Sequence, residues 1–164
     1  MRGTELPRIV AALKGPIDTF VRDARVRVAL LIDRSGQVVA QHGFTSSYEV
    51  MNVASLAAAA HATSHALADV TSVGGWSHLH HAGTRQELFL ATLTTPTAPL
   101  ILVAIFDSES SLGLVQLFFG QLAVRVAALP ELQRVSASAD QHSFERDLEA
   151  GIARAFAPDS RSGA

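Results

Sequence analysis

Apolar positions recur along the chain at two periods, and each period predicts a different kind of element. Over the first 22 residues they recur every three to four positions, the spacing of one helical face, so we expect a helix over residues 5–22. Pro16 lies inside this helix and could kink or split it. Two short apolar runs follow, residues 26–32 and 37–42, and the polar turn between them predicts a β-hairpin.

The next stretch, residues 48–73, predicts a long alanine-rich helix that Ser46 or Ser47 caps and that Gly74-Gly75 ends. One stripe of this helix is expected to pack on a sheet. Its members are Val53, Leu56, Ala60, Ser64, Leu67 and Val70.

Three more strand-like runs follow at residues 76–82, 85–94 and 99–106. The last of them, PLILVAIF, is wholly apolar. A run without alternation predicts a strand that is covered on both faces, so we place it at the centre of the sheet. A further apolar helix is expected over residues 112–129, ended by Pro130.

This order predicts an α+β sandwich: helix, two strands, helix, three strands and helix, with a five-stranded antiparallel sheet. We expect residues 1–130 to form this one domain. Residues 131–139 would be a linker to an amphipathic C-terminal helix over residues 140–156, whose Phe144, Leu148 and Ile152 share one face. Residues 157–164 are expected to be a disordered tail.

Charge and composition exclude several classes of protein. The net charge of −2 gives no broad attraction to nucleic acid. The uncharged stretches at residues 50–68 and 88–106 are too polar or too broken to predict membrane insertion, and the N-terminus has no signal-peptide core. The absence of cysteine excludes disulfides and thiolate metal sites, and it fits a cytoplasmic protein.

The sequence carries no motif for nucleotide chemistry, because no G-x-x-x-x-G-K-[ST] occurs and the single lysine, Lys14, lies in a predicted helix. The chain is therefore not itself a P-loop GTPase.

Two other arrangements of polar residues have ordinary structural explanations. His61 and His65 stand one helical turn apart, and His78 and His80 share one face of a strand. A metal site would need both pairs together, and we expect none. A Ser77, His78 and Asp107 triad can be written down but lacks a nucleophile elbow, and Asp33 and Asp107 are expected to stabilise turns.

The alanine-rich helix is the feature with the clearest functional meaning. Eight alanines lie between residues 50 and 72, and packing on the sheet accounts for one stripe of the helix only. Small side chains elsewhere permit the close approach of a partner. The candidate interface residues are therefore those of this helix and of the strand that follows it: Ala54, Ala58, His61, Ala62, His65, Ala66, Trp76, His78 and His80.

Two stretches resemble the roadblock family of dynein light chains and bacterial GTPase regulators, and in particular its MglB branch. The first is RVALLIDRSGQVVAQHG, with an apolar strand, an Asp-Arg-x-Gly turn and a second strand; the second is LILVAIFDSESSLGLVQL. The small-residue stretch NVASLAAAAHAT and the His81-Ala82-Gly83 tripeptide also resemble the family. The apolar residues 117–122 depart from it, since MglB relatives carry basic residues there.

The resemblance implies a roadblock-type α/β sandwich that forms a homodimer through its second helix and third strand. It also implies that the dimer binds the GTP-bound form of a Ras-like, MglA-type small GTPase and accelerates GTP hydrolysis by that GTPase. Such regulators act in the control of bacterial polarity and gliding motility. The C-terminal helix of MglB relatives contacts the GTPase. The resemblance nominates no arginine finger, catalytic residue, cofactor or metal in this chain.

Two alternatives stay open. One is a roadblock scaffold or effector subunit, homodimeric or heterodimeric, without effect on hydrolysis, which the apolar residues 117–122 favour. The other is a small-molecule or metal sensor of the same architecture, which the seven histidines favour.

Overall fold

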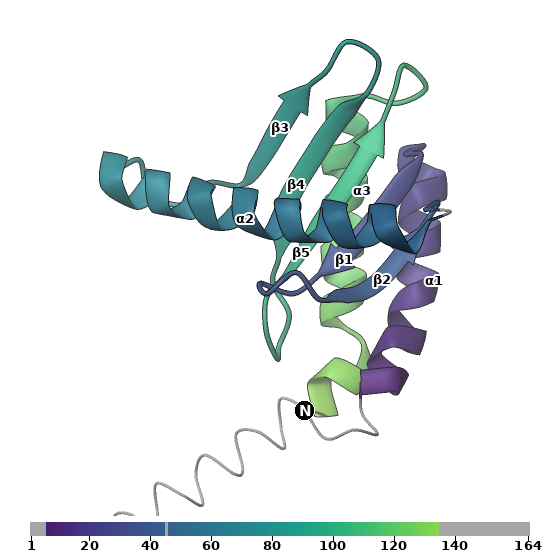
Figure 1. Cartoon of the computed structure of the whole chain (residues 1–164). Coiled ribbons are helices and arrows are strands. Elements are labelled where there is room, and N and C mark those ends of the chain that lie inside the picture. Colours follow the sequence, from purple (N-terminus) through teal and green to yellow (C-terminus); the bar gives the residue numbers. More distant parts are fainter. Residues whose placement is uncertain (1–5, 45, 135–164) are drawn as a thin grey trace, which may run out of the picture.

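A computed structural model describes residues 6–44 and 46–134 of the chain. The elements follow the predicted order, three helices and five strands, arranged as an open sandwich (Figure 1). They are α1 (Leu6–Ala24), β1 (Val28–Ile32), β2 (Val38–His42), α2 (Ser47–Thr71), β3 (His78–Ala82), β4 (Glu87–Leu93), β5 (Leu100–Phe106) and α3 (Leu112–Ala127).

The strands form one antiparallel sheet in the order β2-β1-β5-β4-β3. The wholly apolar β5 lies at the centre, as its lack of alternation predicts, and all its residues except Ile105 are buried. In β1 the residues alternate between the two faces: Ala29 and Leu31 pack on one side, and Leu30 and Ile32 pack on the other. The two short edge strands, β2 and β3, are the more exposed ones.

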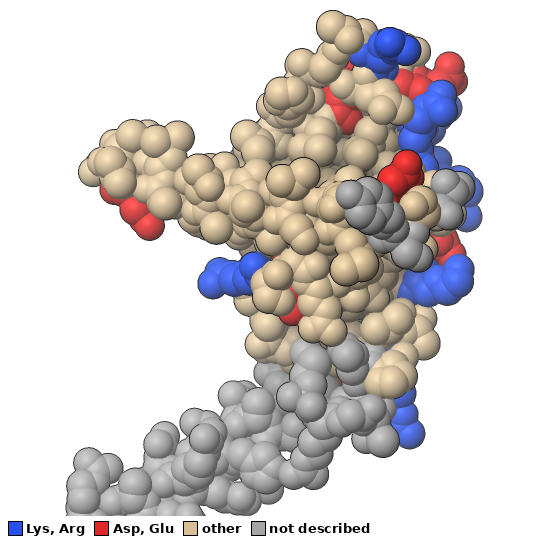
Figure 2. Space-filling model, viewed as in Figure 1, with Lys and Arg blue, Asp and Glu red and all other residues tan. Residues whose placement is uncertain are grey.

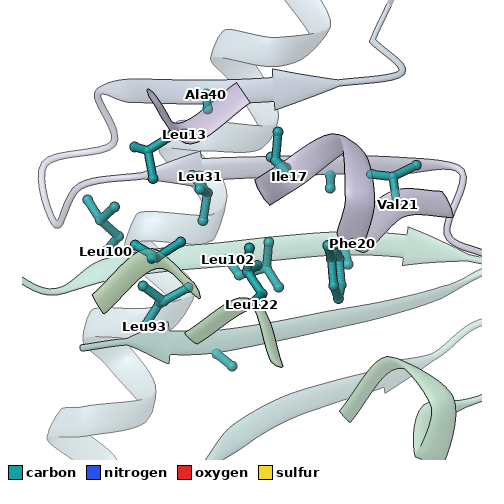
Figure 3. Packing of buried hydrophobic residues seen from close by; sticks show 14 of the residues in the cluster. Leu13, Ile17, Phe20, Val21, Leu31, Ala40, Leu93, Leu100, Leu102 and Leu122 are labelled. Carbon is teal, nitrogen blue, oxygen red and sulfur yellow. The ribbon is translucent and has the colours of Figure 1, made fainter. Parts of the chain in front are cut away.

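One face of the sheet is covered by α1 and α3. The helical stripe of Leu13, Ile17 and Phe20 is buried against Leu31 and Leu102 (Figure 3). Pro16 does not split α1, which runs unbroken from Leu6 to Ala24. Ser111 caps the N-terminus of α3, and its hydroxyl accepts a hydrogen bond from the Leu114 amide at 3.3 Å.

The other face is crossed by α2 alone, and here the predicted helix phase is wrong for the larger apolar residues, although Val53 packs on the core of this face as predicted. The residues that face the sheet are Val50, Ala54, Ala57, Ala58 and His61. Leu56, Leu67 and Val70, which we expected to face it, are 62–83% exposed. The β1–β2 turn approaches the helix on its inner side: a Cβ on Gly36 would be in ordinary van der Waals contact with it, 3.4 Å from the Ala54 carbonyl oxygen and 3.5 Å from the Ala58 Cβ. The alanines therefore lie where the turn meets the helix.

Two helix ends also differ from expectation. α2 ends at Thr71 because Ser72 adopts the left-handed conformation (φ 54°), two residues before the expected glycines. After α3, residues 130–134 are helical, although we expected a linker from residue 131. The expected C-terminal helix over residues 140–156 and the tail over residues 157–164 lie outside the described residues.

Among the residues that the structure describes, no helix is both long and apolar enough to cross a membrane.

Candidate functional site

The edge of the sheet at β3 is open. β3 pairs with β4 through residues from His78↔Ala91 to Ala82↔Glu87, and no strand of the described residues pairs with its other side. The backbone N–H and C=O groups along such an edge are free to pair with another strand. The edge is therefore a ready surface for β-sheet extension.

Helix α2 runs past this open edge (Figure 1). Its 25 residues span about 37 Å, whereas five strands span about 19 Å across the sheet. The overhanging C-terminal part of α2 covers a hollow of about 250 Å³, whose lining includes Leu67, Val73, Trp76 and Leu79. Leu67 and Val73 are 62% and 75% exposed. An apolar hollow beside an open edge has the character of an interface rather than of a solvent surface.

The outward face of α2 is a second uncharged surface. No Asp, Glu, Lys or Arg occurs from residue 50 to residue 68, and Figure 2 shows this part of the helix free of charged side chains up to its projecting end. Its exposed members include Met51, Leu56, Ala59, Thr63 and Ala66. We call this set the α2 outer face.

The alanines that we predicted to contact a partner differ in their exposure to solvent. Ala62 and Ala66 are exposed and remain available. Ala54 and Ala58 are wrong as contact residues, because they are 1% and 9% exposed and pack on the protein's own sheet. Sequence reasoning missed Met51 and Leu56, the large apolar residues of the α2 outer face. The absence of any charge over 19 residues was the signal that pointed to them.

His61, His65 and Trp76 form one aromatic cluster under α2, at the root of the overhang. The ring centroids lie 4.5 Å apart for the two histidines, and Trp76 lies 5.5 Å from His61 and 5.3 Å from His65. His61 Nε2 lies 2.7 Å from Thr92 Oγ1. Burial, with the charges of His65 and Arg34, holds the pKa of His61 below its ordinary value. These residues are therefore largely structural in the protomer.

Two nitrogen atoms of this cluster, His65 Nε2 and Trp76 Nε1, are buried without a hydrogen-bond partner in the described part of the chain. A buried polar group without a hydrogen-bond partner lowers the stability of the folded protein. Both belong to residues that we predicted to lie at an interface.

His78 and His80 lie on the opposite face of the sheet from His61 and His65. His78 stacks on Phe89 at 5.3 Å and lies 3.0 Å from Gln116 of α3, while His80 Nε2 lies 2.6 Å from the Glu87 carboxylate. The sheet thus separates the two pairs that a shared metal site would require. The described residues contain no cluster of three metal-ligating side chains.

The residues of the hypothetical Ser77, His78 and Asp107 triad do not come together in the structure. Ser77 Oγ lies 2.9 Å from His78 Nδ1, but Asp107 follows the far end of β5, where it pairs with Arg27. The Glu109 amide and the Arg27 guanidinium hold the pKa of Asp107 below its ordinary value.

Asp33 stabilises the β1–β2 turn in the same manner. It accepts hydrogen bonds from the Ser35 amide and hydroxyl and from the Gln37 amide at 2.6–2.9 Å. Burial raises the pKa of Asp33, but these bonds outweigh it and lower the pKa overall. Turn chemistry therefore explains both aspartates.

Comparison with known proteins places this geometry in a family. The model of the Roadblock/LC7 domain matches residues 17–106, from the second half of α1 to the end of β5. No curated protein matches the chain.

Solved structures of MglB are similar to this chain. Myxococcus xanthus MglB is 27% identical over 73% of this chain and 92% of that one, with a TM-score of 0.62. The gliding protein MglB of Thermus thermophilus is 26% identical over 82% and 95%, with a TM-score of 0.61. An MglB with a tetrameric arrangement is 26% identical over 82% and 94%, also with a TM-score of 0.61.

Proposed function

The chain belongs to the Roadblock/LC7 family, and on this premise we propose that it is a homodimeric regulator that binds a Ras-like small GTPase of the MglA type and accelerates GTP hydrolysis. The observation that carries the proposal is that helix α2 has two separate uncharged surfaces. The underside of the α2 overhang adjoins an open strand edge, and the α2 outer face stays exposed.

The homodimer forms through β3 and the overhang. Two copies of β3 pair across a two-fold axis, which joins the five-stranded sheets into one sheet of ten strands and removes the free edge. Each overhang then lies on the partner's sheet, where Leu67 and Val73 lose their exposure to water. Trp76 lines the hollow beside this contact, and His65 packs on Trp76.

The GTPase binds the α2 outer face. In the dimer the two α2 helices lie side by side on one face of the joined sheet, and Leu56 of each helix, with Ala59, Ala62 and Ala66, forms one apolar platform. The platform recognises the GTP-bound switch regions by shape and apolar contact rather than by charge, since the helix has no charged residue there.

Acceleration of hydrolysis works through positioning of the GTPase's own residues. An arginine finger needs a guanidinium that leaves its own protein and enters the GTPase site. Arg27 is engaged with Asp107, whereas Arg34, at the β1–β2 turn, is exposed. We assign no catalytic residue to this chain: stabilisation of the catalytic arrangement of the switch regions lowers the barrier, and replacement of Arg34 tests this assignment.

Nucleotide-dependent binding tests the proposal. The GTPase is loaded with GDP or with a non-hydrolysable GTP analogue, and its affinity for this protein is measured by fluorescence anisotropy. We expect the GTP-analogue form to bind at least about tenfold more tightly, a difference of about 1.4 kcal/mol. Equal affinity for the two forms, or no binding of either, contradicts the proposal.

A scaffold or effector that does not change hydrolysis is the alternative. The observation that favours it is the exposed apolar side of α3, where Leu117 and Val124 are 58% and 71% exposed, because it offers a surface apart from α2. A dimer that binds the GTP form but leaves its hydrolysis rate unchanged would establish this alternative.

A further inference from the structure

The outward side of α3 is apolar and uncovered. Leu117 and Val124 stand two helical turns apart on one side of the helix and are 58% and 71% exposed. Gly113, Gly120 and Gln121 are exposed too, and α3 has no charged residue before Arg125. A surface helix ordinarily turns charged side chains to water, so this side has the composition of a contact surface.

The sequence supplies a segment with the matching pattern. From residue 140 to residue 156 the apolar residues Phe144, Leu148 and Ile152 recur every four positions, which places them on one face if the segment is helical. Gly151 disfavours an isolated helix, and a helix of this length is marginal in water without a surface to bind. The segment therefore needs an apolar partner surface.

The length of chain between the two surfaces permits contact. The described chain ends at Arg134 after the helical residues 130–134, and five residues separate it from residue 140. These five span up to about 17 Å when extended, enough to reverse the chain direction. Seventeen helical residues measure about 25 Å, close to the length of about 24 Å for the 16 residues of α3.

Charge favours this face of the molecule over the α2 face. The segment carries Asp140, Glu145, Asp147 and Glu149 against two arginines. α1 and α3 together carry Arg8, Lys14, Arg22 and Arg125 against two aspartates, and basic side chains line the margin over α1 in Figure 2. α2 carries Glu49 and Asp69 and no basic residue. An acidic helix is therefore attracted to the α1–α3 layer and repelled by α2.

We propose that residues 140–156 fold back as an amphipathic helix along the outward side of α3 of the same chain, so that Phe144, Leu148 and Ile152 cover Leu117 and Val124. This contact lies apart from the proposed dimer surface and the α2 outer face, which lie at the edge and on the other face of the sheet, and it differs from the GTPase contact that the resemblance implies for the C-terminal helix.

Distance measurement between spin labels tests the contact in the full chain. The protein has no cysteine, so Gly120→Cys with Ala150→Cys gives two unique labels. A Cβ at Gly120 meets no atom within 4 Å, and helical spacing places Ala150 opposite the apolar face of the segment. Thr63→Cys with Ala150→Cys is the control pair, because Thr63 is exposed on α2. An excess of unlabelled chain ensures that both labels of a measured pair belong to one copy.

We expect a short, narrow distance distribution from residue 120 to residue 150 and a clearly longer one from residue 63. Leu117→Glu combined with Val124→Glu should broaden the short distribution, whereas Met51→Glu, an equally exposed site on α2, should not. A broad distribution that these changes leave unaltered overturns the proposal. So does a shorter distance to residue 63, or a short distance that disappears when unlabelled chain is added, which would assign the surface to a second copy.

Discussion

Enlarging Ala54 tests the orientation of α2, on which the division between its buried and exposed faces depends. Ala54 is 1% exposed, and its backbone lies in contact distance of the β1–β2 turn at Gly36. Ala54→Leu adds three carbons where no space exists, and such overpacking costs about 1–3 kcal/mol. Leu and Ala differ little in helix propensity, so the cost reports packing alone.

Ala59→Leu is the matched control, because it makes the same change on the α2 outer face, where residue 59 is exposed. It should alter stability by less than about 0.5 kcal/mol. For a chain of this size, a loss of about 2 kcal/mol lowers Tm by about 4–8 °C. Thermal and urea unfolding at one protomer concentration measure both variants. Equal stability of Ala54→Leu and Ala59→Leu would refute the orientation of α2 described above.

Three further predictions concern the proposed surfaces and one titrating group. Leu56→Glu should weaken binding of the GTP-loaded GTPase by about tenfold or more, as an apolar anchor becomes a buried charge, while Ala11→Glu on α1 leaves anisotropy titrations unchanged. Leu67→Glu should raise the dimer dissociation constant by about tenfold or more in sedimentation equilibrium, and an unchanged constant would exclude the overhang as the dimer contact. Because the pKa of His61 is depressed in the folded protein, its contribution to stability is complete above its unfolded pKa of about 6.5 and is lost as pH falls below it. Urea unfolding from pH 7.5 to pH 5 should show this loss in the natural protein and a smaller one in His61→Gln; identical pH profiles would contradict it.

Much of the fold could be predicted because its signals are local. The apolar run that becomes β5 has no polar residue to turn to water, so it could only be a central strand. The β1–β2 hairpin follows from the five-residue loop 33–37, in which Asp33 accepts hydrogen bonds from amides of its own loop. In both cases the residues that determine the structure lie within the element itself.

The orientation of α2 could not be predicted because it depends on a distant residue. The helix has apolar residues all around it, so periodicity offered several stripes, and the larger leucines were the stronger candidates for the core. The turn at Gly36, which approaches the helix at Ala54 and Ala58, belongs to a different part of the chain. The sequence alone also gave no indication that α2 extends past β3, since that depends on how the strands are ordered in space.

The most direct test of the proposed function is single-turnover GTP hydrolysis by the MglA-type GTPase, with and without a molar excess of this protein. The proposal predicts a rise in the rate constant of about tenfold or more, through positioning rather than an inserted group. The rise should persist in Arg34→Ala, since loss of a true arginine finger would cost about 10³-fold or more, and with Leu56→Glu it should require about tenfold more protein or more. An unchanged rate constant at saturating protein would contradict the claim that this dimer activates its GTPase.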